Sequence, residues 1–159
     1  MNIKYCNVKI LKKKIDSLKK NNLKIGFTNG CFDLLHKGHI KLLVAAKKSC
    51  DFLVVAINSD DSVKLLKGKN RPIDKEKVRV EKLSKVNEVD LITIFSENTP
   101  EKIIFEIIPD VLIKGADYKK NEIIGVDIVL KNGGEIKIVE LIQGVSTTKI
   151  INFQNQKIK

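Results

Sequence analysis

The chain has two histidines, His36 and His39, which lie three positions apart in the segment TNGCFDLLHKGH (28–39). Side chains three positions apart at a helix start lie on one face, so both imidazole rings can point the same way. Gly30 in the preceding turn lets the backbone come close to a ligand, and the free N–H groups of a helix start attract phosphate. These residue types predict a phosphate-binding turn with two imidazole donors.

Other interpretations of this turn stay open from the residues alone. A single histidine at a helix start is commonly a cap or a packing residue, and a pair could bind a metal. Zinc takes further ligands at known spacings, and none is visible in the sequence. The turn matches neither GxGxxG nor GxxxxGK[ST], which excludes the standard dinucleotide and P-loop motifs. Phosphate handling is therefore favoured, and no residue is predicted to bind a metal.

A second candidate segment is Ser146-Thr147-Thr148, which begins the last predicted helix. It offers hydroxyls, N–H groups and the positive end of a helix dipole to the outer phosphates of a nucleotide. Taken alone, it reads more readily as an ordinary N-cap. Because Gly144 precedes it and the two histidines accompany it in the chain, we interpret it as a phosphate clamp.

The elements that must position these segments follow from an alternation of patterns. Short, nearly continuous apolar runs suit strands buried in a parallel sheet, and they cover 24–29, 51–58, 90–95, 110–115 and 135–141. Helical spacing predicts helices at 7–20, 39–50, 74–86 and 99–108, after Asn121 and from Ser146. Thr99 is expected as the N-cap of its helix, with Pro100 as the first helical residue. The order predicts an α/β fold with a doubly wound, Rossmann-like parallel sheet and a binding crevice at the strands' carboxyl ends.

Composition restricts the class of protein further. The 159 residues are 43% hydrophobic and 31% charged, which predicts one soluble domain with a leading helical segment (1–23) and a catalytic core (24–155). No apolar run reaches the roughly 18 residues of a membrane span, and no signal peptide is visible, so a cytoplasmic protein without a membrane partner is expected. The three cysteines form no CxxC pair, so neither a disulfide framework nor a zinc site is predicted.

The net charge of +11 raises the question of a nucleic-acid partner. Arg71 and Arg79 are the only arginines among the 30 basic residues, and the lysines are spread along the chain instead of forming one stripe. Nucleic-acid recognition tends to use clustered basic residues and the arginine fork. No nucleic acid is therefore expected as a partner, although the positive field would draw in nucleotides.

The stretch from Gly30 to His39 matches the pattern GxFDxxHxGH completely, and it resembles the signature of the cytidylyltransferase-like nucleotidyltransferases. From about Lys24 onward, nearly the whole chain resembles the D-glycero-β-D-manno-heptose 1-phosphate adenylyltransferase branch of that family. The stretches that carry this likeness are NSD (58–60), LKG (66–68), NRPI (70–73), VLIKGADY (111–118) and GVSTT (144–148). HxGH with a late STT is specific to the superfamily, whereas KG–RPI and KGADY indicate the heptose branch. The resemblance implies the HxGH fold and transfer of AMP from ATP to the heptose phosphate, giving ADP-heptose and pyrophosphate.

The resemblance also implies roles for individual residues. His36, His39 and Lys67 are expected to be catalytic, the histidines by donating hydrogen bonds to phosphate oxygens in the transition state. Nucleotide contacts are expected from Asn29, Gly30, Cys31, Phe32, Gly38, Lys114, Gly115, Asp117, Tyr118, Gly144, Ser146, Thr147 and Thr148. Acceptor contacts are expected from Asp33, Asn58, Lys67 and Arg71.

Three of these residues carry alternatives. Lys67 is expected in a polar loop after the second strand, where an ordinary surface lysine is the competing interpretation. Asp33 is expected to fix the turn through backbone hydrogen bonds more than to act as an acid or base. Cys31 is a small residue beside the phosphates and is not assigned as a nucleophile.

Cofactor and partners follow from the resemblance as well. Mg²⁺ is expected to bind with ATP, a sugar 1-phosphate is the other substrate, and a homo-oligomer is expected. Relatives that use CTP often have arginine where this chain has Leu141, which favours ATP. In many bacteria the heptose enzyme is fused behind a sugar kinase domain, for which this chain is too short, so a separate heptose kinase is expected to supply the substrate. A glycerol-3-phosphate cytidylyltransferase-type enzyme and a nucleotide- or nucleic-acid-binding regulatory domain remain as alternatives.

Overall fold

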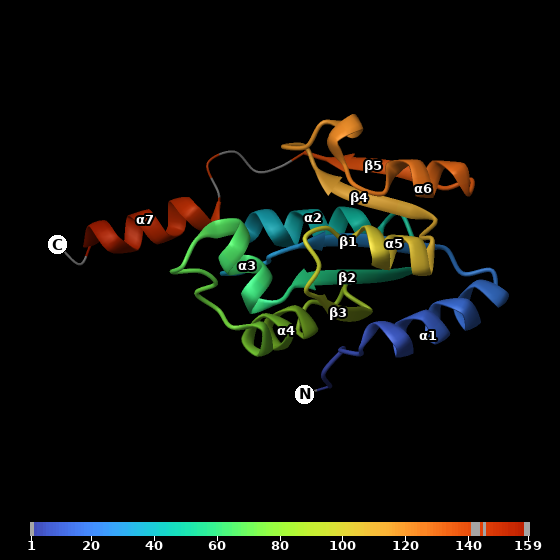
Figure 1. Ribbon diagram of the computed structural model, residues 1–159, viewed down its shortest axis with the longest axis horizontal. Coiled ribbons are helices and arrows are strands. Elements are labelled where there is room, and N and C mark those ends of the chain that lie inside the picture. The colour runs from blue at the N-terminus through green and yellow to red at the C-terminus, as the bar shows by residue number, and fades with distance from the viewer. Residues whose placement is uncertain (1, 141–143, 145, 158–159) are drawn as a thin grey trace.

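A five-stranded parallel sheet forms the centre of the protein (Figure 1). The computed structural model describes residues 2–140, 144 and 146–157. The strands lie in the order β3-β2-β1-β4-β5, with bounds β1 (Ile25–Gly30), β2 (Phe52–Asn58), β3 (Leu91–Phe95), β4 (Val111–Gly115) and β5 (Glu135–Val139). From β1 the chain adds β2 and β3 on one side, and it then crosses over to add β4 and β5 on the other side of β1. This reversal of strand order confirms the doubly wound α/β fold class. The strand starts lie within about one residue of those predicted.

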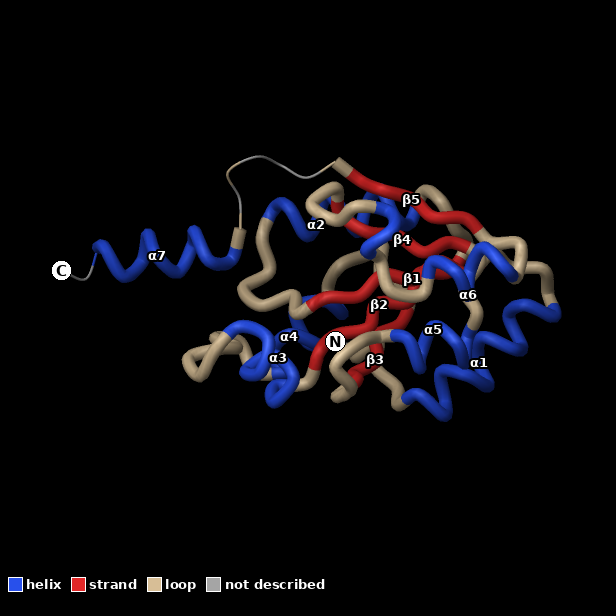
Figure 2. The backbone as a smooth tube through the Cα atoms, turned by 45° about the horizontal axis from the view of Figure 1, so that its top comes forward, coloured by secondary structure: helices blue, strands red, loops and turns tan. Residues whose placement is uncertain are grey.

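Helices cover both faces of the sheet (Figure 2). Their bounds are α1 (Val8–Lys20), α2 (Lys37–Lys47), α3 (Asp60–Lys67), α4 (Glu76–Ser84), α5 (Glu101–Ile107), α6 (Val126–Lys131) and α7 (Thr147–Lys157), with a short 3-10 turn η1 (Lys120–Glu122). Apolar residues of α1, α5 and α6 pack on one face, and those of α2 and α4 pack on the other. Alternate residues of β2 enter the two clusters, as the period of a strand requires.

Helix α3 was missed by the sequence analysis, which expected a loop there. Ser59 caps the helix by accepting the N–H of Ser62, and Gly68 ends it with a φ of 104°. Only one side of this short helix is apolar and buried, at Val63, whereas Leu65 is 81% exposed. Lys67 is consequently the last residue of a helix and not part of a loop, so its backbone position is fixed by helical hydrogen bonds.

The start of α5 also differs from the prediction. The helix begins at Glu101, and Pro100 occupies the N-cap position with φ −78° and ψ 7°. Thr99 therefore lies one residue too early to cap the helix, and no side chain caps it. The helix remains anchored through the hydrogen bond from the N–H of Ile104 to the carbonyl of Pro100.

The N-terminal segment is part of the core. Leu11 and Ile15 of α1 are fully buried against α5 and the sheet. Before α1, the N–H of Cys6 bonds to the carbonyl of Ile92 at 3.1 Å, and the N–H of Ile92 bonds to the carbonyl of Lys4 at 2.6 Å. Residues 4–6 thus pair with the outer edge of β3 in the manner of a further parallel strand.

Candidate active site

A pocket of about 500 Å³ lies where β1, β2, β3 and β4 end. Its volume is in the range of small-molecule sites. All of the predicted site residues line it except Gly144: they are Asn29, Gly30, Cys31, Phe32, Asp33, His36, Gly38, His39, Asn58, Lys67, Arg71, Lys114, Gly115, Asp117, Tyr118, Ser146, Thr147 and Thr148. Gly144 is exposed with a φ of 81°. The structure therefore brings together side chains from five separate stretches of the sequence.

The two histidines build the start of α2. His36 is the N-cap, and its Nδ1 accepts the N–H of Gly38 at 3.1 Å. His39 Nδ1 in turn accepts the N–H of His36 at 3.3 Å, and the rings stack with their centroids 3.8 Å apart. Because each Nδ1 is an acceptor, each neutral ring carries its proton on Nε2. Both Nε2–H groups are then left as donors for a ligand in the pocket.

Gly38 is the residue that lets the rings sit this way. A Cβ at this position would lie 2.9 Å from Cε1 of His36, closer than carbon atoms tolerate. The glycine of HxGH is therefore required by the close approach of the His36 ring to the helix backbone.

Both histidines are neutral at physiological pH. Burial lowers the pKa of His36. Burial, with a smaller effect from the neighbouring His36, lowers the pKa of His39 to about 3. The two rings are therefore hydrogen-bond donors without formal charge.

Asp33 holds the turn to a second loop. Its side chain is buried, and its carboxylate accepts hydrogen bonds from Arg71 Nε at 2.7 Å and from the N–H groups of Ile73 and Asp74 at 2.9 and 2.8 Å. Burial raises the pKa of Asp33, but the two N–H groups and the Arg71 guanidinium outweigh it and hold the pKa below its usual value. Both oxygens are thus engaged by the protein, which favours the loop-fixing role over a substrate contact.

The side of the pocket over β2 carries the predicted acceptor residues. Asn58, the last residue of β2, is 5% exposed and donates to Ser62 Oγ at 3.0 Å, while the thiol of Cys31 lies 3.8 Å from its Oδ1. Lys67 forms no ion pair with any described residue. Within the described part of the chain, Arg71 donates to Asp33 through Nε alone, so its two terminal NH₂ groups can face an anion.

Arg79 is a structural residue that the sequence analysis did not assign to the site. It is 1% exposed, and its Nη1 donates to the carbonyls of Cys31 and Asn58 at 2.8 and 2.7 Å. Its other nitrogens donate to the carbonyl of Asp74 and to Oδ1 of Asp60, at 3.0 and 2.9 Å. Arg79 therefore fixes the ends of β1 and β2, both of which line the pocket. The sequence did carry one sign of a special role for Arg79, because it is one of only two arginines in a lysine-rich chain.

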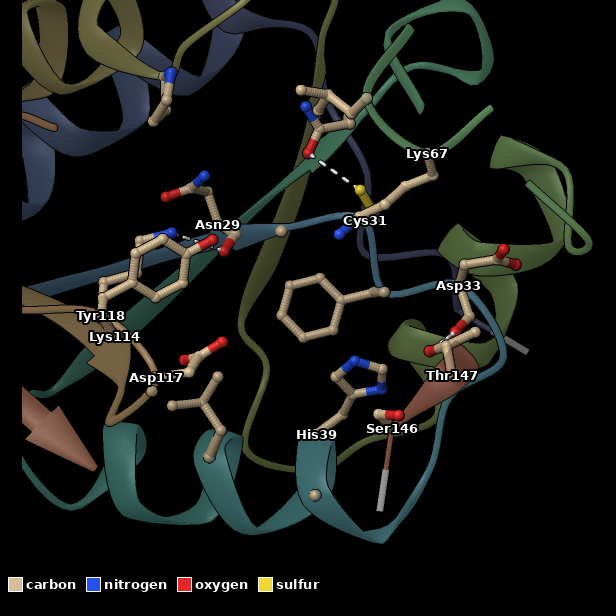
Figure 3. Close-up of a pocket in the computed structure, with 18 of the residues that line it drawn as sticks. Asn29, Cys31, Asp33, His39, Lys67, Lys114, Asp117, Tyr118, Ser146 and Thr147 are labelled. Carbon is tan, nitrogen blue, oxygen red and sulfur yellow. Dashed lines mark hydrogen bonds between the residues drawn. The ribbon is translucent and has the colours of Figure 1, made fainter. Parts of the chain in front are cut away.

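The opposite side of the pocket is formed after β4 (Figure 3). Lys114 is 8% exposed, its Nζ donates to the carbonyl of Asn29 at 3.1 Å, and it lies 5.0 Å from the centroid of the Tyr118 ring. Burial lowers the pKa of Lys114 to about 8, although the carboxylate of Asp117 counteracts part of this effect. The pocket thus contains a buried ammonium that is charged at pH 7 and loses its proton in mildly alkaline solution.

The segment Ser146–Thr148 closes the pocket on the side of Asp33 (Figure 3). Ser146 Oγ accepts the N–H of Lys149 at 3.2 Å, so it caps α7, which is the alternative role that the sequence left open for this segment. Thr147 Oγ1 donates to the carbonyl of Asp33 at 2.7 Å. Leu141, used in the sequence analysis to favour ATP, lies outside the described residues.

Several lining residues were not expected from the sequence. They are Leu42, Leu66, Phe95, Asn98, Thr99, Pro100, Glu122, Ile123 and Ile124. Phe95 is the last residue of β3 and Asn98–Pro100 follow it. The rule that parallel strands open on the crevice at their carboxyl ends could have identified this group.

No group of three or more His, Cys, Asp or Glu side chains in the described part of the chain could hold a metal ion. No helix within residues 2–140 and 146–157 is long and apolar enough to cross a membrane.

Comparison with known proteins places this pocket in context. A model of the cytidylyltransferase-like family matches residues 27–153. The bifunctional protein HldE of Rhodopseudomonas palustris is 48% identical over 133 residues, covering 84% of this chain and 27% of that protein. HldE of Nitrobacter winogradskyi shows the same identity and coverage. The chain therefore spans little more than a quarter of the length of these curated relatives.

Solved structures are also similar. A lipopolysaccharide core biosynthesis protein from Thermoplasma volcanium is 32% identical with a TM-score of 0.61, covering 76% of this chain and 97% of that one. A pantoate–β-alanine ligase from Francisella tularensis has a TM-score of 0.63 at 17% identity, covering 98% of this chain and 77% of that one, and this likeness concerns the fold alone.

Proposed function

The chain belongs to the cytidylyltransferase-like family, and from this premise we propose that it transfers AMP from ATP to D-glycero-β-D-manno-heptose 1-phosphate. The products are ADP-heptose and pyrophosphate. The observation that carries the proposal is the pair of Nε2–H donors at His36 and His39, which share one pocket with the start of α7.

The reaction needs alignment and charge stabilisation more than covalent help. The acceptor phosphate attacks the α-phosphorus of ATP, and negative charge builds up on the oxygens around it. His36 and His39 donate to these oxygens from fixed positions, because their Nδ1 atoms are held by backbone N–H groups. Donors that need no reorganisation at the moment of reaction give the largest stabilisation.

The two substrates occupy opposite sides of the pocket in this proposal. Lys114, Asp117 and Tyr118 border the ribose and base, while the free N–H groups at the start of α7 bind the outer phosphates of ATP. The ammonium of Lys67 and the terminal NH₂ groups of Arg71 bind the acceptor phosphate. Both cations lie on the β2 side of the turn with the histidines, so the two phosphates are brought together at His36 and His39.

Mg²⁺ is proposed to enter with ATP. Both oxygens of the Asp33 carboxylate are occupied by protein donors, and no other cluster of ligands was found among the described residues. Mg²⁺ commonly keeps several waters and takes phosphate oxygens as ligands, so the triphosphate would supply its binding site here. The ion would neutralise part of the charge that leaves with pyrophosphate.

The choice of heptose 1-phosphate and ATP rests on the stretches at 66–73 and 111–118 that resemble the heptose branch. Support comes from relatives named HldE and from a relative named for lipopolysaccharide core biosynthesis.

We further propose a cytoplasmic homo-oligomer that receives its substrate from a separate heptose kinase. Size-exclusion chromatography with light scattering would test the oligomer.

One assay tests the proposed reaction. Pyrophosphate release is measured with ATP or CTP against heptose 1-phosphate or glycerol 3-phosphate. We expect ATP with heptose 1-phosphate to exceed the other combinations by at least about two orders of magnitude in kcat/KM, because a site built to hydrogen-bond one ligand leaves polar groups unpaired with another. A preference for CTP with glycerol 3-phosphate would keep the fold and the chemistry but contradict the heptose assignment.

A further inference from the structure

Few interactions between described residues join helix α7 to the rest of the protein. Figures 1 and 2 show it projecting away from the sheet and its covering helices. In the part of the chain that is described, the bond from Thr147 Oγ1 to the carbonyl of Asp33 is the only hydrogen bond that links Ser146 or α7 to another element. The position of the α7 start therefore depends strongly on this contact.

Two hydroxyls of this segment, those of Ser146 and Thr147, already take part in hydrogen bonds within the protein. A threonine hydroxyl has one proton to donate, and that of Thr147 is given to Asp33 at 2.7 Å. Ser146 Oγ accepts from Lys149 within the helix. The N–H groups of Thr147 and Thr148 belong to the first helical turn and have no partner within the helix, so the backbone is left to bind phosphate.

Asp33 is a rigid anchor for such a contact. Its carboxylate is held by three donors and its residue is 1% exposed. Asp33 also belongs to the turn that leads into His36. A bond to its carbonyl consequently fixes the start of α7 relative to the turn that bears the imidazole rings.

We propose that Thr147 is a positioning residue whose hydroxyl holds the start of α7 against the histidine turn before nucleotide binds. In this arrangement the side chain does not bind phosphate itself. It presents the backbone N–H groups of α7 at a fixed place, and nucleotide binding needs no movement of the helix. The consequence for catalysis rests on the proposed function, whereas the tie between Thr147 and Asp33 does not.

The test distinguishes a positioning role of the Thr147 hydroxyl from a direct contact with phosphate, because it observes the protein without nucleotide. Three variants of the full chain are compared: Thr147→Val removes the hydroxyl at constant shape, Thr147→Ser keeps it, and Asn152→Ala changes an exposed residue of α7. Amide hydrogen exchange is followed by NMR at Lys149 and Ile150, whose N–H groups bond to Ser146, and ATP binding is then measured by calorimetry. Neither readout requires a sugar substrate.

We expect Thr147→Val to accelerate exchange at the start of α7 about two- to tenfold, the effect of losing one neutral hydrogen bond. ATP affinity should fall by a similar factor, while Thr147→Ser and Asn152→Ala should stay within about twofold of the unmodified chain. If Thr147→Val weakens ATP binding but leaves exchange in the empty protein unchanged, Thr147 is a phosphate ligand and the proposal is wrong. It is also wrong if Thr147→Ser behaves like Thr147→Val, since the hydroxyl would then be irrelevant.

Discussion

His36 and His39 act as donors because of the way α2 begins. Each Nδ1 accepts a backbone N–H, and burial keeps both rings neutral. The spacing in the sequence predicted that the rings would lie together. It could not predict which nitrogen each ring presents, because that depends on the cap geometry of the folded helix start.

Replacing His39 tests the catalytic assignment. We expect His39→Ala to lower turnover by roughly two to four orders of magnitude, because a donor to the transition state is lost. ATP affinity should fall much less. His39→Gln, which keeps an N–H donor at a different place, should recover part of the activity. Turnover of a folded His39→Ala variant within a few-fold of the unmodified enzyme would remove His39 from the mechanism.

Replacing Lys67 tests whether this lysine binds the acceptor phosphate or the nucleotide. Lys67 ends α3 and forms no ion pair with a described residue, so it should contact the acceptor phosphate. Lys67→Ala is therefore expected to raise the KM for the sugar phosphate well above its effect on the KM for ATP. Lys69→Ala changes an exposed lysine that does not line the pocket and serves as the control. Equal effects of Lys67→Ala on both KM values would show that Lys67 is an ordinary surface lysine.

Lys114 makes nucleotide binding depend on pH. Its pKa of about 8 lies below the usual value for lysine, so the ammonium is present at pH 7 and is lost as the pH rises through 8. We expect the KM for ATP to increase between pH 7 and pH 9, since a positive charge near the nucleotide disappears. The variant Lys114→Met should have a high KM for ATP that no longer varies over this range. A KM that is constant with pH in the unmodified enzyme would contradict this.

At the scale of elements, the strands were predictable and the short helices were less so. The apolar runs that form β1 to β5 are continuous, because both faces of the sheet are covered. Helix α3 has one buried apolar residue, Val63, and two exposed leucines, so no periodic pattern marks it. Arg79 could not be placed by pattern either, since its hydrogen bonds join the ends of two strands to the first residue of α3 and to the loop before α4.

Helix α1 lies before the region matched by the family model, yet it completes one face of the core. Leu11 is fully buried and Ile10 is 54% exposed, so the two neighbours form a matched pair. We expect Leu11→Ala to lower the free energy of unfolding by about 2–5 kcal/mol, the cost of a cavity in a packed core. Ile10→Ala should change it by less than about 0.5 kcal/mol.

Urea unfolding followed by circular dichroism measures both changes. If Leu11→Ala costs no more than Ile10→Ala, α1 does not pack as the structure shows.

At the scale of the whole molecule, Lys4 and Lys19 donate hydrogen bonds to carbonyls at or just beyond the C-terminal ends of helices. Lys19 Nζ donates to the carbonyls of Ile107 and Ile108, the last residue and the C-cap of α5. Lys4 Nζ donates to the carbonyls of Val86 and Val89 after α4, at 2.8 and 2.6 Å. A cation at a helix C-terminus satisfies free carbonyls and the helix dipole. Part of the charge of +11 therefore stabilises the fold, which composition alone could not reveal.

This distribution predicts how the protein behaves toward DNA. Tight binding would need many lysines on one surface that are free to contact phosphates. We expect affinity for a mixed-sequence duplex no better than about 10⁻⁵ M at physiological salt, as in non-specific binding. A salt titration by fluorescence anisotropy measures this, and nanomolar binding that persists at 150 mM salt would favour the nucleic-acid alternative.

The pairing of residues 4–6 with β3 also protects the protein from aggregation through an exposed edge strand. A bare edge strand offers a row of N–H and C=O groups to other molecules, and this is a common route to aggregation. Here the bonds of Lys4 and Cys6 to Ile92 occupy that edge. A chain shortened to begin near residue 24 would keep the pocket residues but expose β3 and the apolar surface beneath α1. It should self-associate through that edge, so affinity tags and fluorescent labels that must leave the protein monodisperse belong away from residues 2–20.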